Sequence, residues 1–418
     1  MKHVTGLQCT VCGRVYPVSA LYTCPACGEV GTLDVQYDYD YINDHTTRHQ
    51  INADPQWWMW RYKRLMPLDP GSPLPPLVIG GTPLYAAQRL AAELGVAEVW
   101  VKDDGRNPTA SLKDRASAMA VVKAQEQGAR LITTASTGNA AAALAGVAAS
   151  VGMPALIFVP ETAPPAKIAQ LLAYGAKVLL VQGTYDVAFD LCFAAAKEND
   201  WYCRSTGINP YVGEGKKTAA YEVVEQMDWE PPDVLVTSVG DGSIIGGQHK
   251  GFYDLLRLGW TDRMPRLIGV QAEGSAALHG AWRDHIDPAK MEPIEAHTVA
   301  DSISAGLPRD RVKAMRAVRE SGGAFVSVSD AEILAAIPAL AQATGVFAEP
   351  AAAAAYAGLR RAVNEGLVKR EDRVVVLITG NGLKDIASAI KAVGRGVTVA
   401  PNLDAVREAV EKLKLETR

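Results

Sequence analysis

Short, continuous apolar runs alternate with alanine-rich stretches of helical length along most of this chain, from Thr82 onward. The runs cover residues 131–135, 155–159, 178–181, 233–238, 266–271 and 373–379. Strands that are apolar on both faces are typical of a parallel sheet, because the helical crossovers between its strands cover both of its faces. The sequence therefore predicts an α/β fold built on open parallel sheets. Functional sites in such folds lie at the carboxyl ends of the strands.

Length and composition narrow the class of protein. At 418 residues the chain is long enough for two or three domains. Hydrophobic residues make up 48% and charged residues 21%, and with a net charge of −4 we expect neither nucleic acid nor an anionic membrane as a partner. The N-terminus lacks the apolar core of a signal peptide, and the most apolar stretch, 140–159, is interrupted by Gly146, Gly152 and Pro154. We expect a cytoplasmic protein that acts on a small molecule.

Four of the six cysteines form two Cys-x-x-Cys-Gly pairs near the N-terminus, at Cys9, Cys12, Cys24 and Cys27. Two such pairs have the spacing of a four-cysteine zinc ribbon, in which the glycine lets the chain turn under the metal. The sequence predicts a structural Zn²⁺ ion, because four thiolates leave no open position for a substrate. A metal-free ribbon and disulfides are the alternatives. Cys192 and Cys203 are isolated in apolar surroundings and are predicted to be buried.

Lys113 lies in the run Asn107-Pro-Thr-Ala-Ser-Leu-Lys-Asp-Arg115, after a predicted strand at 98–102 and a turn-rich loop at 103–109. Ser111 is predicted to be a helix N-cap, which places Lys113 in the first turn of the helix. The positive end of the helix dipole disfavours an ammonium group there and lowers the pKa of the lysine. Such an amine can form a Schiff base with an aldehyde. The alternative is a solvated lysine at a helix start.

Small polar residues, Ser136-Thr-Gly-Asn139, follow the strand predicted at 131–135 and precede a long helix. Free backbone amides and hydroxyls at a helix N-terminus can bind an anion, so this segment is predicted to receive a substrate carboxylate. The alternative is a plain N-cap by Ser136 or Asn139.

A glycine-rich loop, Val239-Gly-Asp-Gly-Ser-Ile-Ile-Gly-Gly247, follows the strand predicted at 233–238. Its glycines permit the backbone to approach a phosphate, and the helix that follows directs its dipole toward the same place. The loop lacks the Gly-Lys-Ser/Thr ending of a P-loop. It is one residue off the dinucleotide fingerprint, and Glu273 could act as the ribose acid, so nucleotide binding stays open as an alternative.

A third turn, Thr379-Gly-Asn-Gly-Leu-Lys-Asp385, ends the last predicted strand, where the Thr379 hydroxyl can hydrogen-bond a heterocycle nitrogen. A tight strand-to-helix turn is the alternative.

One bound cofactor with its substrate would explain all four segments: it offers an aldehyde to Lys113, a phosphate to the glycine loop, a ring nitrogen to Thr379 and a substrate carboxylate to 136–139. Pyridoxal 5'-phosphate fits this description.

The segments at 107–115, 135–139, 240–247 and 379–385 resemble, in this order, those of the fold-type II pyridoxal-phosphate enzymes. Asn209-Pro with Glu214-Gly-Lys-Lys-Thr218, and Gly345-Val-Phe-Ala-Glu349-Pro350, resemble the threonine synthase family more than its cousins. One branch of that family also has an N-terminal cysteine ribbon. The resemblance implies two open parallel-sheet α/β domains with a zinc-ribbon-like N-terminal extension.

The resemblance also implies domain limits. These are a zinc-ribbon-like module at 1–36, a large cofactor-binding domain at 37–115 and 210–400, a small substrate-carboxylate domain at 116–209, and a C-terminal helix at 401–418. We expect a homodimer.

The resemblance assigns roles to individual residues. Lys113 is expected to form the Schiff base and to shuttle protons, Asn139 to bond the phenolic oxygen of the cofactor, and Thr379 to face its pyridine nitrogen. The cofactor phosphate is expected at Gly240, Asp241, Gly242, Ser243 and Ile244, and the substrate carboxylate at Ser136, Thr137 and Gly138. Lys216 and Lys217 are candidates for the substrate phosphate; a solvated helix start is the alternative.

Two positions differ from the pattern of the threonine synthase family. Ala140 stands where threonine usually follows the loop asparagine, and Asp301-Ser-Ile-Ser-Ala-Gly306 stands where an arginine-bearing segment is usual. The expected activity is that of a carbon–oxygen lyase acting on phosphates, which converts O-phospho-L-homoserine and water to L-threonine and phosphate. The alternatives are an ammonia-lyase or β-replacement enzyme acting on a hydroxy- or diamino acid, and a non-catalytic nucleotide-binding or regulatory protein.

Overall fold

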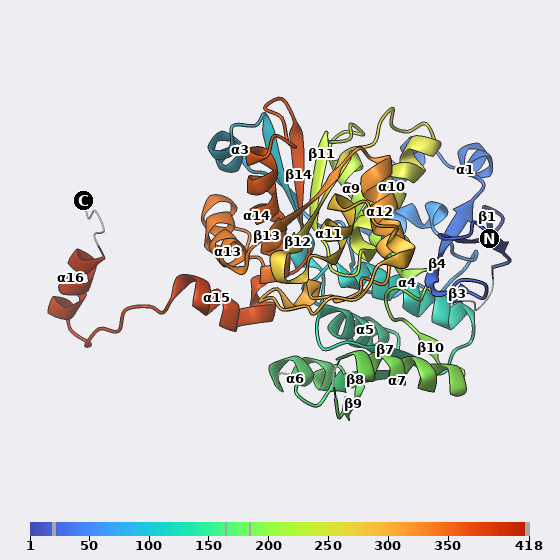
Figure 1. Ribbon diagram of the computed structural model, residues 1–418, viewed down its shortest axis with the longest axis horizontal. Helices are drawn as coiled ribbons and strands as arrows, with labels where there is room; N and C mark the ends of the chain where they lie inside the picture. The colour runs from blue at the N-terminus through green and yellow to red at the C-terminus, as the bar shows by residue number, and fades with distance from the viewer. Residues whose placement is uncertain (19–21, 164, 184, 414–418) are drawn as a thin grey trace.

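The computed structural model describes residues 1–18, 22–163, 165–183 and 185–413. In this part of the chain lie a six-stranded sheet, a four-stranded parallel sheet and a small N-terminal sheet (Figure 1). Each apolar run predicted to be a strand forms one, with ends that differ by one residue at most, and the α/β prediction is confirmed. Among the described residues, no helix is both long and apolar enough to cross a membrane.

The large sheet has the strand order β13-β12-β11-β14-β6-β5, in which all neighbours are parallel except the edge strand β5. Its strands are β5 (Leu84–Ala86), β6 (Glu98–Asp103), β11 (Val234–Ser238), β12 (Arg266–Ala272), β13 (Ala324–Val328) and β14 (Arg373–Ile378). Alternate residues of β11 belong to different cores: Val234 and Val236 pack in one, and Leu235 packs in the other. Burial of both faces explains why the strands read as continuous apolar runs.

Helices cover both faces of the large sheet. One face packs against α3 (Gln88–Leu94), α13 (Asp330–Thr344) and α14 (Pro350–Asn364), and the other against α9 (Thr218–Gln226), α10 (Ser243–Arg257), α11 (Ala277–Arg283) and α12 (Arg311–Glu320). Shorter elements connect them: α8 (Val212–Lys216), η2 (Asp104–Arg106), η3 (Glu273–Ser275), η4 (Pro288–Lys290), η5 (Asp301–Ile303) and η6 (Gly382–Asp385).

The smaller parallel sheet has the order β10-β7-β8-β9 and lies beside the first (Figure 1). Its strands are β7 (Ile132–Ala135), β8 (Ala155–Pro160), β9 (Lys177–Val181) and β10 (Tyr202–Cys203). Its helices are α5 (Asn139–Ser150), α6 (Pro165–Ala173) and α7 (Tyr185–Glu198), and α4 (Lys113–Glu126) packs on α5 in the same core. Cys192 and Cys203 are buried as expected.

The N-terminal sheet has the order β2-β1-β4-β3, with β1 (Val4–Cys9), β2 (Val15–Tyr16), β3 (Thr23–Cys24) and β4 (Gly28–Tyr37). The chain then forms α1 (Tyr39–His45), α2 (Arg48–Asn52) and η1 (Met59–Leu65). The buried aromatics Trp60 and Tyr62 anchor this segment on the body of the molecule.

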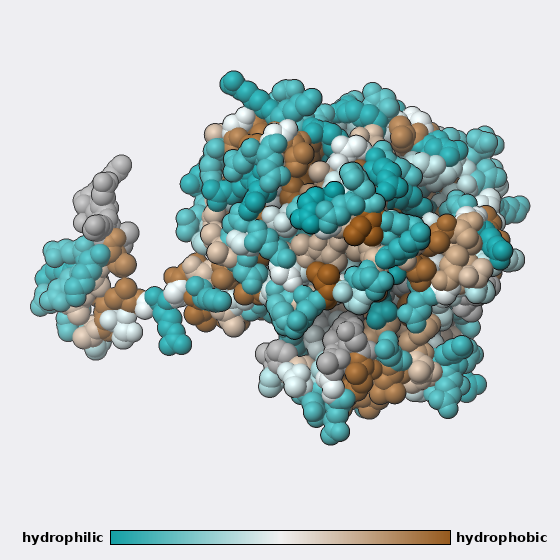
Figure 2. Space-filling view, in the orientation of Figure 1, coloured by the Kyte–Doolittle hydropathy of each residue, from teal (hydrophilic) through white to brown (hydrophobic). Residues whose placement is uncertain are grey.

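The C-terminal arm, residues 386–413, contacts α13 at its start and then projects from the body (Figure 1). It consists of α15 (Ile386–Val393) and α16 (Leu403–Lys412), neither of which contains a buried residue. Apolar side chains lie exposed along it, including Ile386, Val393 and Leu403. Figure 2 shows apolar surface on the arm.

Candidate active site

The segments singled out in the sequence meet at the carboxyl ends of the parallel strands. The loop before α4 and the turn after β14 pair directly: the Leu112 amide donates to the Thr379 carbonyl at 2.9 Å, and the Asn381 amide to the Ala110 carbonyl at 3.1 Å. Asn139 reaches the same turn from the smaller sheet, because a Cβ atom placed on Gly380 would lie 3.2 Å from its Nδ2. Both parallel sheets therefore contribute to one site.

Lys113 is the first residue of α4 and is partly buried. Burial is the main cause that lowers its pKa to about 8, and the Arg204 guanidinium lowers it further. The carboxylates of Asp241 and Glu349 oppose the shift. The direction is the one the sequence predicted from the helix dipole, but burial is the larger cause. An amine with a pKa of about 8 is still mostly protonated at pH 7, but its neutral, nucleophilic fraction is far larger than that of an ordinary lysine.

The predicted N-cap at Ser111 is wrong. Leu112 occupies the cap position of α4 without a side-chain bond, and the buried Ser111 hydroxyl has no hydrogen-bond partner within the described residues. The preceding residue, Ala110, has a φ of 67°, the left-handed region that L-residues rarely adopt. Asp114 stabilises this turn by accepting from the amide of Thr109 at 2.7 Å and from its hydroxyl. Tertiary pairing with residues 379–381 thus decides the start of the helix.

A buried ion network lies behind Lys113, and no local pattern in the sequence marks which of its residues pair. Arg115 donates to both carboxylate oxygens of Asp104, at 2.7 and 2.9 Å, and to both of Glu222, at 2.6 and 2.7 Å. The ammonium group of Lys102 also donates to Glu222, at 2.7 Å. Two cations and two anions balance in charge, so the network fixes the base of the loop that presents Lys113. The feature of the sequence that could have indicated a buried ion network here is the presence of charged residues directly after a buried strand.

The glycine loop forms the N-terminus of α10. Gly242 is its N-cap with a φ of 88°, and a Cβ atom there would lie 2.8 Å from that of Ala314. Lys216 is fully buried and donates to the hydroxyl of Ser243 in the first turn of this helix. Burial, and then the nearby Lys113 and Arg204, hold the pKa of Lys216 well below its usual value. Helix amides beside a buried amine are suited to a phosphate group.

Glu273, which the nucleotide-binding alternative would use as the ribose acid, lies 3.8 Å from Arg361.

Thr137, Gly138 and Asn139 of the segment 136–139 line a cavity of about 120 Å³ between the two sheets, whereas Ser136 does not line it. Gly138 is the N-cap of α5 without a side-chain bond, and the Gly138 amide donates to the Ser136 hydroxyl at 3.2 Å, so neither Ser136 nor Asn139 is the cap. The cavity is lined by Thr137, Gly138, Asn139, Ala142, Lys167, Gln170, Asp301, Ser302, Glu349, Pro350, Ala351, Leu383, Lys384 and Asp385. Lys167 of α6 bridges to Asp301 of η5 at 2.6 Å and so connects the two sides.

Glu349 is a further buried carboxyl in this site, for which the sequence assigned no role. Its Oε1 accepts from Asn139 Nδ2 at 2.7 Å. Burial is the main cause that raises its pKa to about 7. Thr379 lies at the end of β14 and is also buried.

Lys217 lies elsewhere. Its ammonium group is 2.7 Å from Glu214 and 2.7 Å from Asp254, and it donates to the Tyr37 hydroxyl at 3.1 Å. Tyr37 belongs to β4, so this fully buried lysine connects the N-terminal sheet to the body. Neither of the two predicted lysines lines the cavity. Lys216 lies near Lys113 and the glycine loop, whereas Lys217 is paired with Glu214 and Asp254.

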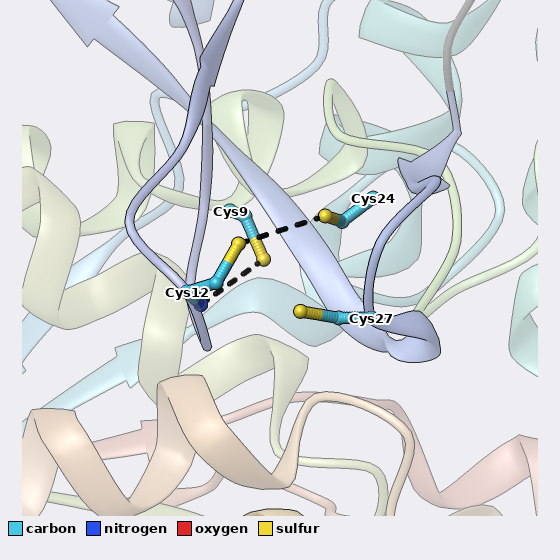
Figure 3. A group of neighbouring side chains, drawn as sticks. All are labelled: Cys9, Cys12, Cys24 and Cys27. Carbon is cyan, nitrogen blue, oxygen red and sulfur yellow. Dashed lines mark hydrogen bonds between the residues drawn. The ribbon is translucent and has the colours of Figure 1, made fainter.

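The four N-terminal cysteines form one cluster, with all Sγ atoms within 4.8 Å of one another. Figure 3 shows the sulfur atoms of Cys9, Cys12, Cys24 and Cys27 directed toward a common centre. The Sγ atoms of Cys12 and Cys24 are 3.8 Å apart, about the separation that tetrahedral Zn–S bonds of about 2.3 Å require. Gly31 passes close behind the cluster: a Cβ atom there would lie 2.6 Å from that of Cys27.

Comparison with known proteins gives a family for most of the chain. Residues 76–380 match the family model of pyridoxal-phosphate dependent enzymes. The threonine synthase of Methanosarcina acetivorans is 40% identical over 408 residues, which cover 97% of this chain and 98% of that protein. The threonine synthase of Methanocaldococcus jannaschii is 36% identical over 411 residues, which cover 97% and 99%.

Solved structures of the same fold are more distant in sequence. Threonine deaminase isoform 2 from Solanum lycopersicum has a TM-score of 0.65 at 21% identity, covering 86% of this chain and 90% of that one. Diaminopropionate ammonia lyase from Escherichia coli has a TM-score of 0.65 at 18% identity, covering 83% and 92%. At this identity the likeness concerns the fold.

Proposed function

This chain belongs to the pyridoxal-phosphate dependent enzymes, and we infer that it is a threonine synthase that works at the site around Lys113. The near-complete alignment to threonine synthases over the whole chain supports this reaction over that of the ammonia-lyases, which share the fold at lower identity. The overall conversion is loss of phosphate from O-phospho-L-homoserine and addition of water to give L-threonine. We propose the residue roles below for this reaction.

The residues of the site fit the cofactor. Pyridoxal phosphate, when bound, supplies an aldehyde for a covalent link to an amine and a ring that withdraws electrons from the substrate. Lys113 is the amine, with a pKa of about 8. Residues Gly240, Asp241, Gly242, Ser243 and Ile244 would hold the phosphate, and Lys216, buried against Ser243, would add a cation there. The buried hydroxyls of Ser111 and Ser238 have no hydrogen-bond partner among the residues that the structure describes, and such a ligand could satisfy them.

At the ring, Asn139 would donate to the phenolic oxygen and the Thr379 hydroxyl would face the pyridine nitrogen. A neutral hydroxyl leaves that nitrogen unprotonated, which suits elimination and replacement better than transamination. Lys113 would accept and return the substrate protons, since its pKa lies close to the working pH.

The substrate would lie in the cavity between the sheets. Its carboxylate would be received by Ser136, Thr137 and Gly138 at the N-terminus of α5. Lys167 and Lys384 line the same cavity. We propose that these two lysines bind the substrate phosphate, a role predicted for Lys217, whose ammonium group is instead paired with Asp254. The Lys167–Asp301 contact between the sheets supports closure of the predicted small domain, 116–209, over the bound substrate.

One assay tests the function. Purified holoenzyme is supplied with O-phospho-L-homoserine, serine, threonine or diaminopropionate, and phosphate, ammonia and keto acid are measured. Phosphate release with threonine as the product is expected; ammonia release without phosphate release would assign a lyase instead. The Lys113→Ala variant should lose the borohydride-reducible link to the cofactor, whereas a variant of the exposed Lys391 should keep it. Label on a lysine other than Lys113 would contradict the site.

Two further assignments rest on the N- and C-terminal parts. We propose that Cys9, Cys12, Cys24 and Cys27 bind a structural Zn²⁺ ion, supported by their sulfur cluster.

We also propose a homodimer in which the C-terminal arm binds a second copy of this chain. In α16, Leu403, Val406 and Val410 recur at helical spacing, followed by Leu413 at the C-cap. A ten-residue helix is marginal in water without a packing partner. A cytoplasmic location stays a prediction from the sequence.

A further inference from the structure

Glu349 lies at the junction of the segments that form the site. It is the N-cap residue of α14 but makes no side-chain cap bond, so its carboxylate is not used to begin that helix. Its backbone amide donates to the Gly380 carbonyl at 3.1 Å, directly after Thr379. A Cβ atom on Gly380 would lie 2.1 Å from Glu349 Oε1, so only glycine leaves room for the carboxylate. The fold thus places a buried acid against the turn that pairs with the Lys113 loop.

The carboxylate fixes the orientation of Asn139. An asparagine amide nitrogen carries two N–H groups, and the bond of 2.7 Å to Glu349 uses one of them. A carboxylate can only accept, so this bond also decides which end of the amide is the nitrogen. The second N–H is then free to donate toward a ligand held at Lys113.

The charged groups around Glu349 come from several elements. They are Lys113 of α4, Lys167 of α6 with its partner Asp301 of η5, and Lys384 and Asp385 of η6. Burial raises the pKa of Glu349 to about 7, while the Asn139 bond and the three lysines oppose that shift. The carboxyl therefore changes charge near neutral pH.

We propose that Glu349 is a positioning residue that orients the Asn139 amide toward the phenolic oxygen of the cofactor, and that its charge tunes the protonation of the nitrogen linking Lys113 to the cofactor. The proposal rests on the proposed function, because it needs the cofactor at Lys113. A negative charge at Glu349 favours a proton on that nitrogen, and its loss at lower pH removes this preference. The visible absorbance of the bound cofactor reports that protonation.

The test is a pH titration of the cofactor absorbance in holoenzyme, from about pH 5 to about pH 9, around the pKa of the carboxyl. Wild-type enzyme is expected to show a step near neutral pH. Glu349→Gln keeps an oxygen that accepts from Asn139 but carries no charge. It should lose the step and bind cofactor within about threefold of wild type, since the hydrogen bond persists. Glu349→Ala should lose the step and bind cofactor roughly tenfold more weakly.

Two variants complete the design. Glu349→Asp keeps the charge and should keep a step, which serves if the glutamine variant does not fold. Glu371→Gln, at an exposed glutamate outside the site, should titrate as wild type does. An unchanged step in Glu349→Gln overturns the proposal and points to Asp114, whose pKa burial raises to about 6. A Glu349→Asp enzyme that binds the cofactor but shows no step in cofactor absorbance would also overturn the proposal. A cofactor link that survives in Lys113→Ala would instead overturn the proposed function.

Discussion

Arg115 and Glu222 form a fully buried bidentate ion pair, with N–O distances of 2.6 and 2.7 Å, between the helix that carries Lys113 and helix α9. The two residues are 107 positions apart in the sequence. Asp104 and Lys102 complete the network, so the charges balance where no water can screen them. The pair holds the start of α4, and with it Lys113, against the large sheet.

Replacing Glu222 with glutamine should destabilise the protein by about 3–5 kcal/mol, because Arg115 and Lys102 would keep buried charges without a full counter-charge. Urea unfolding of the apoprotein measures this. The control is Glu230→Gln, which removes an exposed pair with Arg263 at 3.9 Å and should cost less than about 1 kcal/mol. Equal effects of the two substitutions would contradict the structural role of the network.

The stability of the apoprotein should depend on pH through Glu349. An unfolded glutamate titrates near 4.5 and the folded carboxyl near 7, so between these values the folded state binds more protons. Stability from this group is therefore lost as pH rises from about 4.5 to about 7, by up to about 3 kcal/mol. Melting temperatures of wild type and Glu349→Gln, compared across this range, should diverge in favour of the variant at higher pH. Parallel curves would refute the assignment.

Removing the proposed zinc should affect stability more than turnover. Cys9→Ser is expected to lower the metal content from one zinc per chain and to reduce the melting temperature, since four thiolates define the site. Gly31→Ala should act in the same direction, because its Cβ atom would meet Cys27. Gly280→Ala, far from the cysteines in sequence and in α11, is the control, as nothing lies within 4 Å of its Cβ position. Metal analysis that finds no zinc in the wild-type protein would rule out the proposed zinc site.

Ala110→Gly should stabilise the protein by roughly 0.5–1 kcal/mol. The left-handed backbone costs an L-residue about 1–2 kcal/mol, and the extra freedom of glycine in the unfolded chain removes part of that gain. Ala118→Gly, in the buried middle of α4, should instead destabilise by about 1 kcal/mol. Thermal unfolding of both variants measures whether Ala110→Gly is stabilised and Ala118→Gly destabilised. Destabilisation by Ala110→Gly would mean that the turn carries no strain.

Leu403→Glu on α16 should shift the protein from dimer to monomer, because it places a charge within the apolar stripe of the arm. Glu408→Lys lies on the opposite side of the helix and should leave the assembly unchanged. Sedimentation at several concentrations measures both. A wild-type protein that stays monomeric at every concentration would remove the arm as a dimer contact.

The sequence alone determined most strands of the two parallel sheets, the position of Lys113 at a helix start and the pairs of cysteines. Each depends on local information, such as a continuous apolar run, a turn before a helix or a fixed spacing. Short strands without a strong apolar run, β5, β10 and β13, were not predicted. Their pairing with neighbouring strands, more than their own composition, makes them strands.

Tertiary structure alone decided which charges meet. Asn139 and Glu349 are 210 residues apart, and no local pattern marks their contact. Lys216 and Lys217 are adjacent in sequence, yet one lies against the glycine loop and the other is paired with Glu214 and Asp254, because successive residues of a helix point to different sides. The cap of α4 likewise follows from pairing with the turn after β14, which overrode the serine preference at residue 111. Local chemistry thus specified the elements and the type of site, whereas long-range packing set the partners and protonation of its buried groups.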